Sequence, residues 1–324
     1  MQQSMRGRAV ADTHIAGAGT GFQGKVAGNQ AQPLSDSTMA PSTSATVSGL
    51  GAIVLWSALA SLTVLKGAVP PFATTAIAFA VGGLVLVATA IWRGRVRELV
   101  PTRASLALGI YGLFCYHALY FAALYLAPPA EASLIASLWA LFTVVFSGLL
   151  PNQPLRRRHL LAALIGLGAA TLLVWNSLGD VAAGPQRALG LALAFGCALV
   201  WSSYSVASRL FAAVPSDSIA IPCLITAGLA ALASHTFETW VSPADGLAWL
   251  ALIGLGVGPV GAAFLLWDVG MKGGDVSLLG VLAYAAPILS TALLVVLGLA
   301  APSIQLGLAC ALMVLATAIA ARPS

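Results

Sequence analysis

Charged residues are scarce in this sequence, and their scarcity excludes a soluble fold. Only 8% of the 324 residues are Asp, Glu, Lys or Arg, whereas 59% are hydrophobic. Soluble domains carry about 25% charged residues, and a chain this apolar could not cover its surface with polar groups. The mean hydropathy of +0.94 agrees with this. A lipid bilayer is therefore the expected solvent.

The sequence also lacks the signatures of several other classes of protein. Its four cysteines form no CxxC pair and lie inside apolar runs, which argues against a zinc site or a disulfide framework. The motifs HExxH, GxSxG and GxGD of intramembrane enzymes are absent. The net charge of +5 comes from basic residues in short breaks between apolar runs, where topology explains them. We therefore expect no enzyme, no metal, no cofactor and no nucleic-acid partner.

The first 46 residues differ from the rest of the chain. Residues 1–46 are rich in Gly, Gln, Ser, Thr and Ala and contain no apolar core of a signal peptide. They are predicted to form a disordered cytoplasmic tail, and Met39 is an alternative native start.

The remaining sequence predicts ten transmembrane helices in an all-α membrane protein. Apolar runs of about 20 residues are long enough to cross roughly 30 Å of hydrocarbon as helices. The predicted spans are 47–66, 71–92, 104–126, 130–150, 159–176, 188–211, 217–240, 246–270, 275–299 and 302–321.

Basic residues are distributed unevenly between the two sides that these spans define. An even number of spans places both termini on one side, and basic residues favour the cytoplasmic side. Of the 15 Lys and Arg residues, only Lys66 and Arg187 then lie outside. The thirteen inside are Arg6, Arg8, Lys25, Arg93, Arg95, Arg97, Arg103, Arg156, Arg157, Arg158, Arg209, Lys272 and Arg322. Both termini are therefore expected in the cytoplasm.

The two halves of the chain resemble one another at a nearly constant offset. Trp56-Ser57 recurs as Trp201-Ser202, 145 residues later, and Gly112 recurs as Gly256, 144 residues later. The repeats are residues 47–176 and 188–321. Because each repeat holds five spans, an odd number, the second enters the membrane from the opposite side. The sequence therefore predicts two inverted five-helix repeats, the geometry of alternating access.

Aromatic residues with polar tips gather at mid-span positions, where they are candidates for substrate binding. Tyr116, His117 and Tyr120 lie three and four residues apart on one broad helical face. His117 is the only histidine deep within a predicted span, and an ionisable group there is costly enough to suggest a function. Packing against neighbours is the alternative for each aromatic residue. The candidates are Trp56, Tyr116, His117, Tyr120, Trp139, Trp201, Tyr204 and Tyr284.

The motifs that open the halves resemble a known transporter family. Leu55-Trp56-Ser57 and Val200-Trp201-Ser202, with the stretches that begin at Glu131 and Asp275, are similar to the EamA-type drug/metabolite transporter superfamily over about residues 47–321. The resemblance implies two five-helix repeats with short loops and cytoplasmic termini. The aromatic crowding is similar to the YddG-type exporters of aromatic amino acids. We therefore expect a multi-pass protein of the bacterial inner membrane.

This resemblance implies export of aromatic and other hydrophobic amino acids by alternating access through a central aromatic-lined cavity. Indole N–H groups, tyrosine hydroxyls and His117 are the expected donors to the substrate carboxylate. Asp268, Glu131 and Asp275 are interpreted as solvated or helix-N-terminal carboxylates near an interface, since Glu131 and Asp275 lie where a span begins. Without a buried carboxylate to carry protons, facilitated transport by a monomer is expected. Efflux of other amphipathic metabolites or drugs is one alternative, and a non-transporting membrane scaffold is another.

Proline and glycine predict places where the spans bend. The eighth span contains Gly258-Pro259 in a glycine-rich stretch, which lacks the strand and the Lys-Ser/Thr of a phosphate-binding loop. In a membrane helix these residues permit close packing and a break in the backbone ladder. Pro222, Gly258, Pro259 and Pro287 are the candidate hinge or gating residues.

Overall fold

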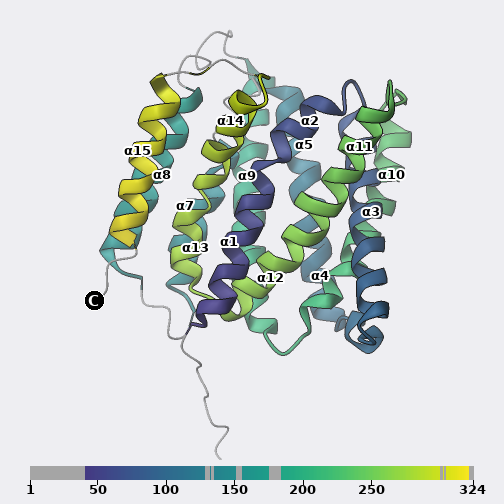
Figure 1. Ribbon diagram of the computed structural model, residues 1–324, viewed down its shortest axis with the longest axis horizontal. Helices are drawn as coiled ribbons and strands as arrows, with labels where there is room; N and C mark the ends of the chain where they lie inside the picture. Colours follow the sequence, from purple (N-terminus) through teal and green to yellow (C-terminus); the bar gives the residue numbers. More distant parts are fainter. Residues whose placement is uncertain are drawn as a thin grey trace, which may run out of the picture. The chain divides into compact units, whose positions relative to one another are not determined.

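A computed structural model describes residues 41–127, 132, 135–150, 155–174, 184–299, 302 and 304–320, and within these ranges every regular element is helical (Figure 1). The first half of the chain contains α1 (Thr43–Ser57), α2 (Leu59–Leu65), α3 (Pro71–Trp92), η1 (Val96–Leu99), α4 (Arg103–Ile110), η2 (Tyr111–Cys115), α5 (Tyr116–Leu126), α7 (Leu138–Ser147) and α8 (Arg157–Val174). The second contains α9 (Pro185–Ala207), η4 (Ser208–Phe211), η5 (Ser216–Ile219), α10 (Ala220–Phe237), α11 (Gly246–Leu255), η6 (Gly256–Ala262), α12 (Ala263–Gly273), α13 (Val276–Leu282), α14 (Ala285–Val296) and α15 (Ile304–Ala320).

Several of these helices are long and apolar enough to cross a membrane. In the described part of the chain six helical stretches meet this requirement, and two shorter apolar helices, Leu138–Ser147 and Gly307–Ala320, accompany them. The six are Thr43–Leu65, Pro71–Trp92, Arg103–Leu126, Pro185–Phe211, Ser216–Phe237 and Gly246–Gly273. The expectation of a membrane protein built of helices is confirmed, and ten crossings stay a prediction.

Two helices begin earlier than the sequence predicted. The predicted tail reaches residue 46, but α1 begins at Thr43, and only residues 1–40 of that tail lie outside the described ranges. The helix begins there because Ser42 acts as an N-cap, its Oγ accepting from the Ala45 N–H at 3.5 Å, and the extent of the tail stays a prediction. Likewise α9 begins at Pro185 rather than at residue 188, since proline suits the first helical turn.

Two π-helical segments interrupt the described helices at corresponding places in the two halves of the chain. η2 lies between α4 and α5, and η6 lies between α11 and α12. The repeat partners Gly112 and Gly256 belong to η2 and η6. Pro259 lies inside η6, where its missing N–H removes a ladder hydrogen bond. The predicted hinge residues Gly258 and Pro259 thus lie where the backbone departs from α-helical geometry.

The other two candidate hinge residues lie near helix starts. Pro222 is the third residue of α10, and Pro287 is the third residue of α14. Backbone N–H groups in the first turn have no partner within the helix, so proline costs little there. Pro259 differs from both, because it lies in the middle of the stretch Gly246–Gly273, inside a π segment. A hinge role for any of them stays a prediction.

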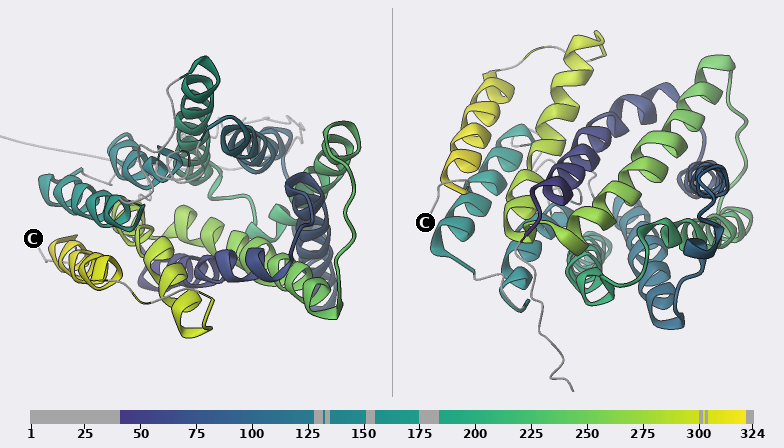
Figure 2. Two further views of the ribbon diagram at one scale, coloured as in Figure 1. Left: turned by 90° about the horizontal axis from the view of Figure 1, so that it is seen from above. Right: turned by 60° about the horizontal axis from the view of Figure 1, so that its bottom comes forward.

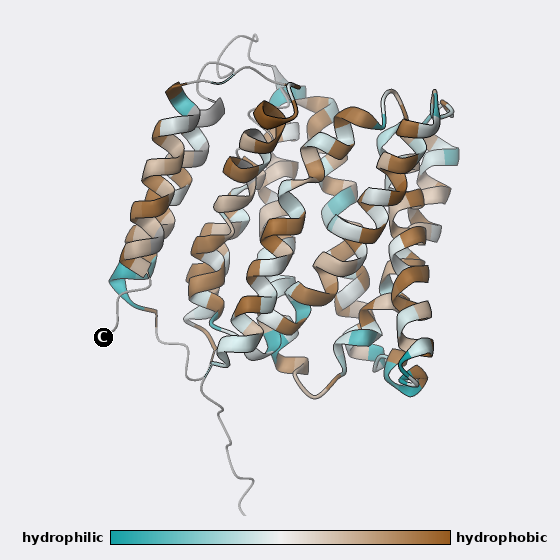
Figure 3. Ribbon diagram, in the orientation of Figure 1, coloured by the Kyte–Doolittle hydropathy of each residue, from teal (hydrophilic) through white to brown (hydrophobic). Residues whose placement is uncertain are grey.

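Helices far apart in the sequence pair with one another. Figure 1 shows α8 beside α15 at one edge and α3 near α10 at the other, and both pairs are in contact. The right-hand view of Figure 2 shows α1 running beside α12. Figure 3 shows apolar residues along the middles of the helices and hydrophilic residues gathered near their ends. This distribution is typical of helices that cross a lipid bilayer.

The N-terminus of α3 is capped by a side chain from a distant loop. Pro70 and Pro71 offer no side-chain acceptor, and Glu238 accepts instead from the N–H groups of Phe72 at 2.6 Å and Ala73 at 2.9 Å. A carboxylate at a helix N-terminus satisfies unpaired donors and interacts favourably with the helix dipole. Glu238 therefore joins the loop after α10 to α3.

Replacing Glu238 by alanine should lower the free energy of unfolding by about 1–2 kcal/mol, because two backbone donors lose a charged acceptor. Thermal unfolding of the detergent-solubilised protein measures the effect. Glu238→Gln, which keeps one acceptor oxygen, should fall between the wild type and Glu238→Ala. Equal unfolding temperatures for all three proteins would contradict the capping role.

Candidate functional site

A cavity of about 280 Å³ lies among the central helices. Seven of the eight aromatic or histidine candidates from the sequence line it, and α1, α5, α7 and α9 supply most of them. The seven are Trp56, Tyr116, His117, Tyr120, Trp139, Trp201 and Tyr284. The structure thus brings together residues that are spread over more than two hundred positions of the sequence.

Tyr204 is the candidate that does not line this cavity. It lies one helical turn beyond Trp201 on α9, and the two ring centroids are 5.4 Å apart. Its ring packs against Gly112 of η2, where an added Cβ would lie 2.2 Å from the ring. Tyr204 lines a smaller neighbouring pocket instead. Its place is therefore behind the cavity wall, not in it.

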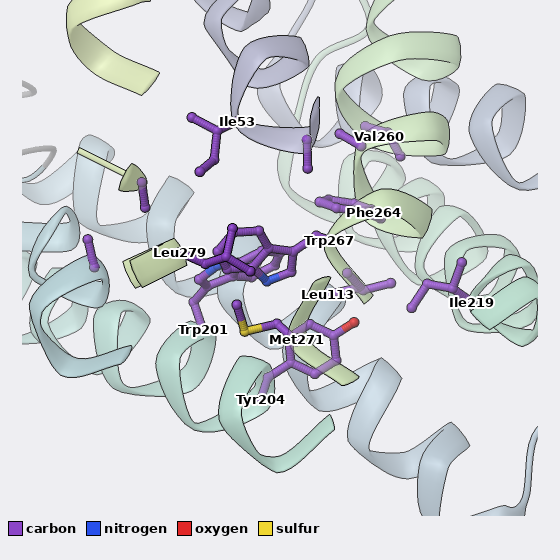
Figure 4. Packing of buried hydrophobic residues seen from close by; sticks show 14 of the residues in the cluster. Ile53, Leu113, Trp201, Tyr204, Ile219, Val260, Phe264, Trp267, Met271 and Leu279 are labelled. Carbon is purple, nitrogen blue, oxygen red and sulfur yellow. The ribbon is translucent and has the colours of Figure 1, made fainter. Parts of the chain in front are cut away.

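Trp56 is the centre of a cluster of aromatic rings. Its ring centroid lies 6.2 Å from that of Trp139, 5.8 Å from that of Trp201 and 5.1 Å from that of Trp267. The Trp139 and Trp201 contacts are edge-to-face, the arrangement that the quadrupole of an aromatic ring favours. Figure 4 labels Trp201, Trp267 and Phe264 of this cluster, and the ring centroids of Trp201 and Phe264 are 5.7 Å apart. The rings form one connected wall.

Two indole N–H groups of this cluster have internal acceptors. Trp56 Nε1 donates to the carbonyl oxygen of Pro259 at 2.9 Å, which ties α1 to the π segment η6. Trp267 Nε1 donates to Ser205 Oγ at 3.0 Å. The sequence predicted indole N–H groups as donors to a substrate carboxylate, but these two are already engaged. They fix the orientation of the rings instead.

The tyrosine face predicted on α5 is present. Tyr116 and Tyr120 are nearly parallel, with an interplanar angle of 8° and ring centroids 5.9 Å apart. Tyr116 also lies 5.0 Å from Trp201, so the α5 face joins the tryptophan cluster. The spacing of four residues placed both rings on the side of the helix that faces the cavity.

His117 is held in one tautomer by the backbone. Its Nδ1 lies 2.6 Å from the carbonyl oxygen of Leu113, and because a carbonyl can only accept, Nδ1 carries the proton. The neutral imidazole then has an acceptor lone pair at Nε2. Its ring lies edge-on to Phe79 at 4.9 Å. His117 therefore offers the cavity an acceptor, whereas the sequence predicted a donor.

Sequence reasoning missed several residues of the site. Phe264 lines the cavity, and its signal was present, because it is the repeat partner of Tyr120 at an offset of 144 residues. The ring of Trp267 contacts those of Trp56 and Trp139 without lining the cavity, and no motif or repeat position indicated it.

The prediction that Asp268 is a solvated carboxylate was wrong, since Asp268 is 5% exposed and its Oδ2 lies 2.6 Å from Lys272 Nζ. Glu131 lies outside the described residues.

Family comparison decides the identity of the fold. Residues 43–175 and 188–322 each match the EamA-like transporter family. The chain belongs to this family. As an EamA-like transporter it holds one family unit in each half, in agreement with the internal similarity of the sequence.

Several relatives of this EamA-like transporter carry a functional name. The aromatic amino acid exporter YddG of Ancylobacter novellus is 51% identical over 281 residues, covering 86% of this chain and 96% of that protein. The proteins of the same name from Salmonella typhimurium and Escherichia coli are each 30% identical, over 77% and 80% of this chain. A solved crystal structure, 52% identical, matches with a TM-score of 0.82 and covers 86% of this chain and 96% of its own.

Proposed function

We propose that this EamA-like transporter exports aromatic and other hydrophobic amino acids through its central cavity. The single observation that carries the proposal is the wall of tryptophan and tyrosine faces around a cavity of about 280 Å³. The exporters of aromatic amino acids that this chain resembles at 51% and 30% identity support the substrate class.

The chemistry of the cavity suits a weakly bound amino acid. An aromatic side chain gains about 0.5–1.5 kcal/mol from each well-placed ring, and an ammonium gains about 0.5–2 kcal/mol over a ring face. His117 Nε2 is placed to accept from the substrate ammonium once Leu113 fixes the tautomer. A millimolar site needs only about −4 kcal/mol, and weak binding suits an exporter that must release its substrate.

The architecture that we propose is ten transmembrane helices in two inverted five-helix repeats, residues 47–176 and 188–321, after a disordered tail. The pattern of helix contacts supports it, because exchange of the halves turns the most extensive helix pairs into pairs that are also in contact. Under this exchange the contact between α1 and α12 corresponds to the contact between α9 and α5. The pair α3 and α10 and the pair α8 and α15 each join two equivalent helices, so the exchange leaves these two pairs unchanged. The matching π segments η2 and η6 support it as well.

We propose the bacterial inner membrane as its location, with both termini in the cytoplasm, and a monomer as its form. α1 begins and α15 ends at the lower end in Figure 1. The basic residues that follow α3, open α8 and close α12 belong to helix ends on that same side, where Figure 3 shows hydrophilic residues. Basic residues favour the cytoplasmic side of a membrane.

Uptake of labelled phenylalanine into liposomes that contain the purified protein tests the function. Threonine and a nucleoside serve as comparison substrates, each with and without an imposed pH gradient. We expect selective phenylalanine flux that needs no gradient, because the described residues that line the cavity include no Asp or Glu to carry protons. Empty liposomes provide the background.

The variants Trp139→Ala and His117→Ala test whether the cavity carries this flux. Each removes a lining side chain, and each should lower phenylalanine flux about tenfold through the loss of one ring contact or one acceptor. Flux of the nucleoside in preference to phenylalanine would favour efflux of other metabolites. No flux of any substrate above the background would favour a membrane scaffold.

A further inference from the structure

A second, much smaller pocket lies beyond the wall of the central cavity. Its volume is about 30 Å³, enough for one or two water molecules. Tyr204, Ser208, Ser218, Asp268 and Lys272 give it a polar lining. It lies where α9 and α12 end and where α4 and α10 begin, the end of the molecule that carries most of the basic residues.

A buried ion pair forms one side of this pocket. Lys272 Nζ lies 2.6 Å from Asp268 Oδ2, one turn apart on α12, and the two side chains are 11% and 5% exposed. Lys272 Nζ also donates to the carbonyl oxygen of Val214 at 2.8 Å. Both charges therefore face inward at the end of a helix that also carries Phe264 and Trp267.

Stability alone does not explain this ion pair. The free energy needed to remove two charges from water is about as large as the free energy of their attraction. A protein with well-packed apolar residues in place of a buried ion pair is often equally stable or more stable. An ionisable residue in an apolar helix is expensive for the same reason. Arg209 at the same end binds the backbone, since its Nη1 donates to the carbonyl oxygens of Met271 and Gly274 after α12, whereas Lys272 binds a buried carboxylate as well as a carbonyl oxygen. The Asp268–Lys272 pair is accordingly a candidate for a ligand site.

Tyr204 connects the pocket with the central cavity. Its ring lines the small pocket and contacts Trp201, whose ring lines the cavity. Because Gly112 has no Cβ, the Tyr204 ring of α9 packs directly against the π segment η2. The pocket and the cavity are thus neighbouring compartments, with Trp201 and Tyr204 between them.

The central cavity leaves the substrate carboxylate without a cation. Among its described lining residues there is no lysine or arginine, and Trp56 Nε1 already donates to Pro259. An amino acid carries a carboxylate and an ammonium on one carbon atom, the same two charges as Asp268 and Lys272. If the pair separates, each member gains a counterion of opposite sign from one zwitterion, so no charge is left unpaired.

We propose that Asp268 and Lys272 form a loading site for the head group of an amino acid, with Lys272 binding the carboxylate and Asp268 binding the ammonium. This inference rests on the proposed function. In the conformation described, the pair is closed on itself and the pocket is too small for a substrate. Opening of this end of the molecule exchanges the internal pair for the zwitterion, which then passes Tyr204 into the cavity.

Competition by head-group analogues tests the loading site. The flux of labelled phenylalanine into liposomes is measured in the presence of one of three unlabelled competitors. They are phenylalanine itself, phenethylamine, which lacks the carboxylate, and 3-phenylpropionate, which lacks the ammonium. In the wild type, half-inhibition of the flux by either analogue should need a concentration about tenfold or more above that of unlabelled phenylalanine, because each analogue loses one charge-assisted contact. In Lys272→Gln the preference over phenethylamine should disappear, and in Asp268→Asn the preference over 3-phenylpropionate should disappear.

Two further variants separate recognition from folding. Asp268→Asn with Lys272→Gln removes both charges without leaving one unpaired, and it should lose both preferences while remaining folded. The matched control is Arg95→Gln with Asp217→Asn, which removes an ion pair of 3.1 Å at the same end but outside the pocket and should keep both preferences. Unchanged preferences in the double variant at 268 and 272 would overturn the loading site. Absence of phenylalanine flux in the wild type would overturn the proposed function and this inference with it.

Discussion

Trp56→Ala is expected to lower phenylalanine transport at least about 100-fold. The ring of Trp56 contacts Trp139, Trp201, Phe264 and Trp267, and each such contact is worth about 0.5–1.5 kcal/mol. A 100-fold loss corresponds to about 2.8 kcal/mol, more than the loss of one ring contact with the substrate, because the neighbouring rings of the wall also lose the side chain that orients them. Alanine also removes the donor that joins α1 to the Pro259 carbonyl.

Initial rates in liposomes measure this effect, and Trp56→Phe is the matched control. Phenylalanine keeps a ring among its neighbours but loses the N–H, so a loss of about three- to tenfold is expected from one hydrogen bond. Size-exclusion profiles of both variants check that they are folded. A rate for Trp56→Ala equal to that of Trp56→Phe would show that the ring wall does not bind the substrate.

Gly82→Ala is expected to cause the largest loss of stability. An added Cβ would lie 2.7 Å from the carbonyl oxygen of Gly256 and 2.9 Å from the backbone nitrogen of Gly261. Backbone atoms cannot move aside as a flexible side chain can, so α3 and η6 must separate. Overpacking of this kind costs about 1–3 kcal/mol or more. The unfolding temperature of the detergent-solubilised protein should fall accordingly.

Gly228→Ala is the matched control for this substitution. Gly228 lies within α10, and a Cβ there would meet no heavy atom within 4 Å. Alanine in a helix interior is favoured over glycine by about 0.5–1 kcal/mol, so the unfolding temperature should be unchanged or slightly higher. A similar decrease for Gly82→Ala and Gly228→Ala would contradict the close approach of α3 and η6.

Sequence reasoning succeeded for the α5 face and failed for the polar groups around it. Tyr116, His117 and Tyr120 could be predicted to share a face because helical spacing is local and fixed. The direction of the hydrogen bond at His117 could not be predicted, since it depends on the Leu113 carbonyl of η2, which accepts from the Tyr116 N–H and from the imidazole as well. Asp268 was misjudged because its distance from the end of a span says nothing about what covers it.

The sequence by itself determined that the chain is apolar and helical, that its halves are related, and that its mid-span aromatic residues are concentrated in a few spans. These properties depend on composition, periodicity and the offset of the repeats. Only the tertiary structure decided that Trp267 joins the tryptophan cluster, that Tyr204 lies behind the cavity wall, and that Asp268 and Lys272 face a polar pocket. Such contacts depend on how distant helices cross and where π segments turn a side chain, and neither is a property of local sequence.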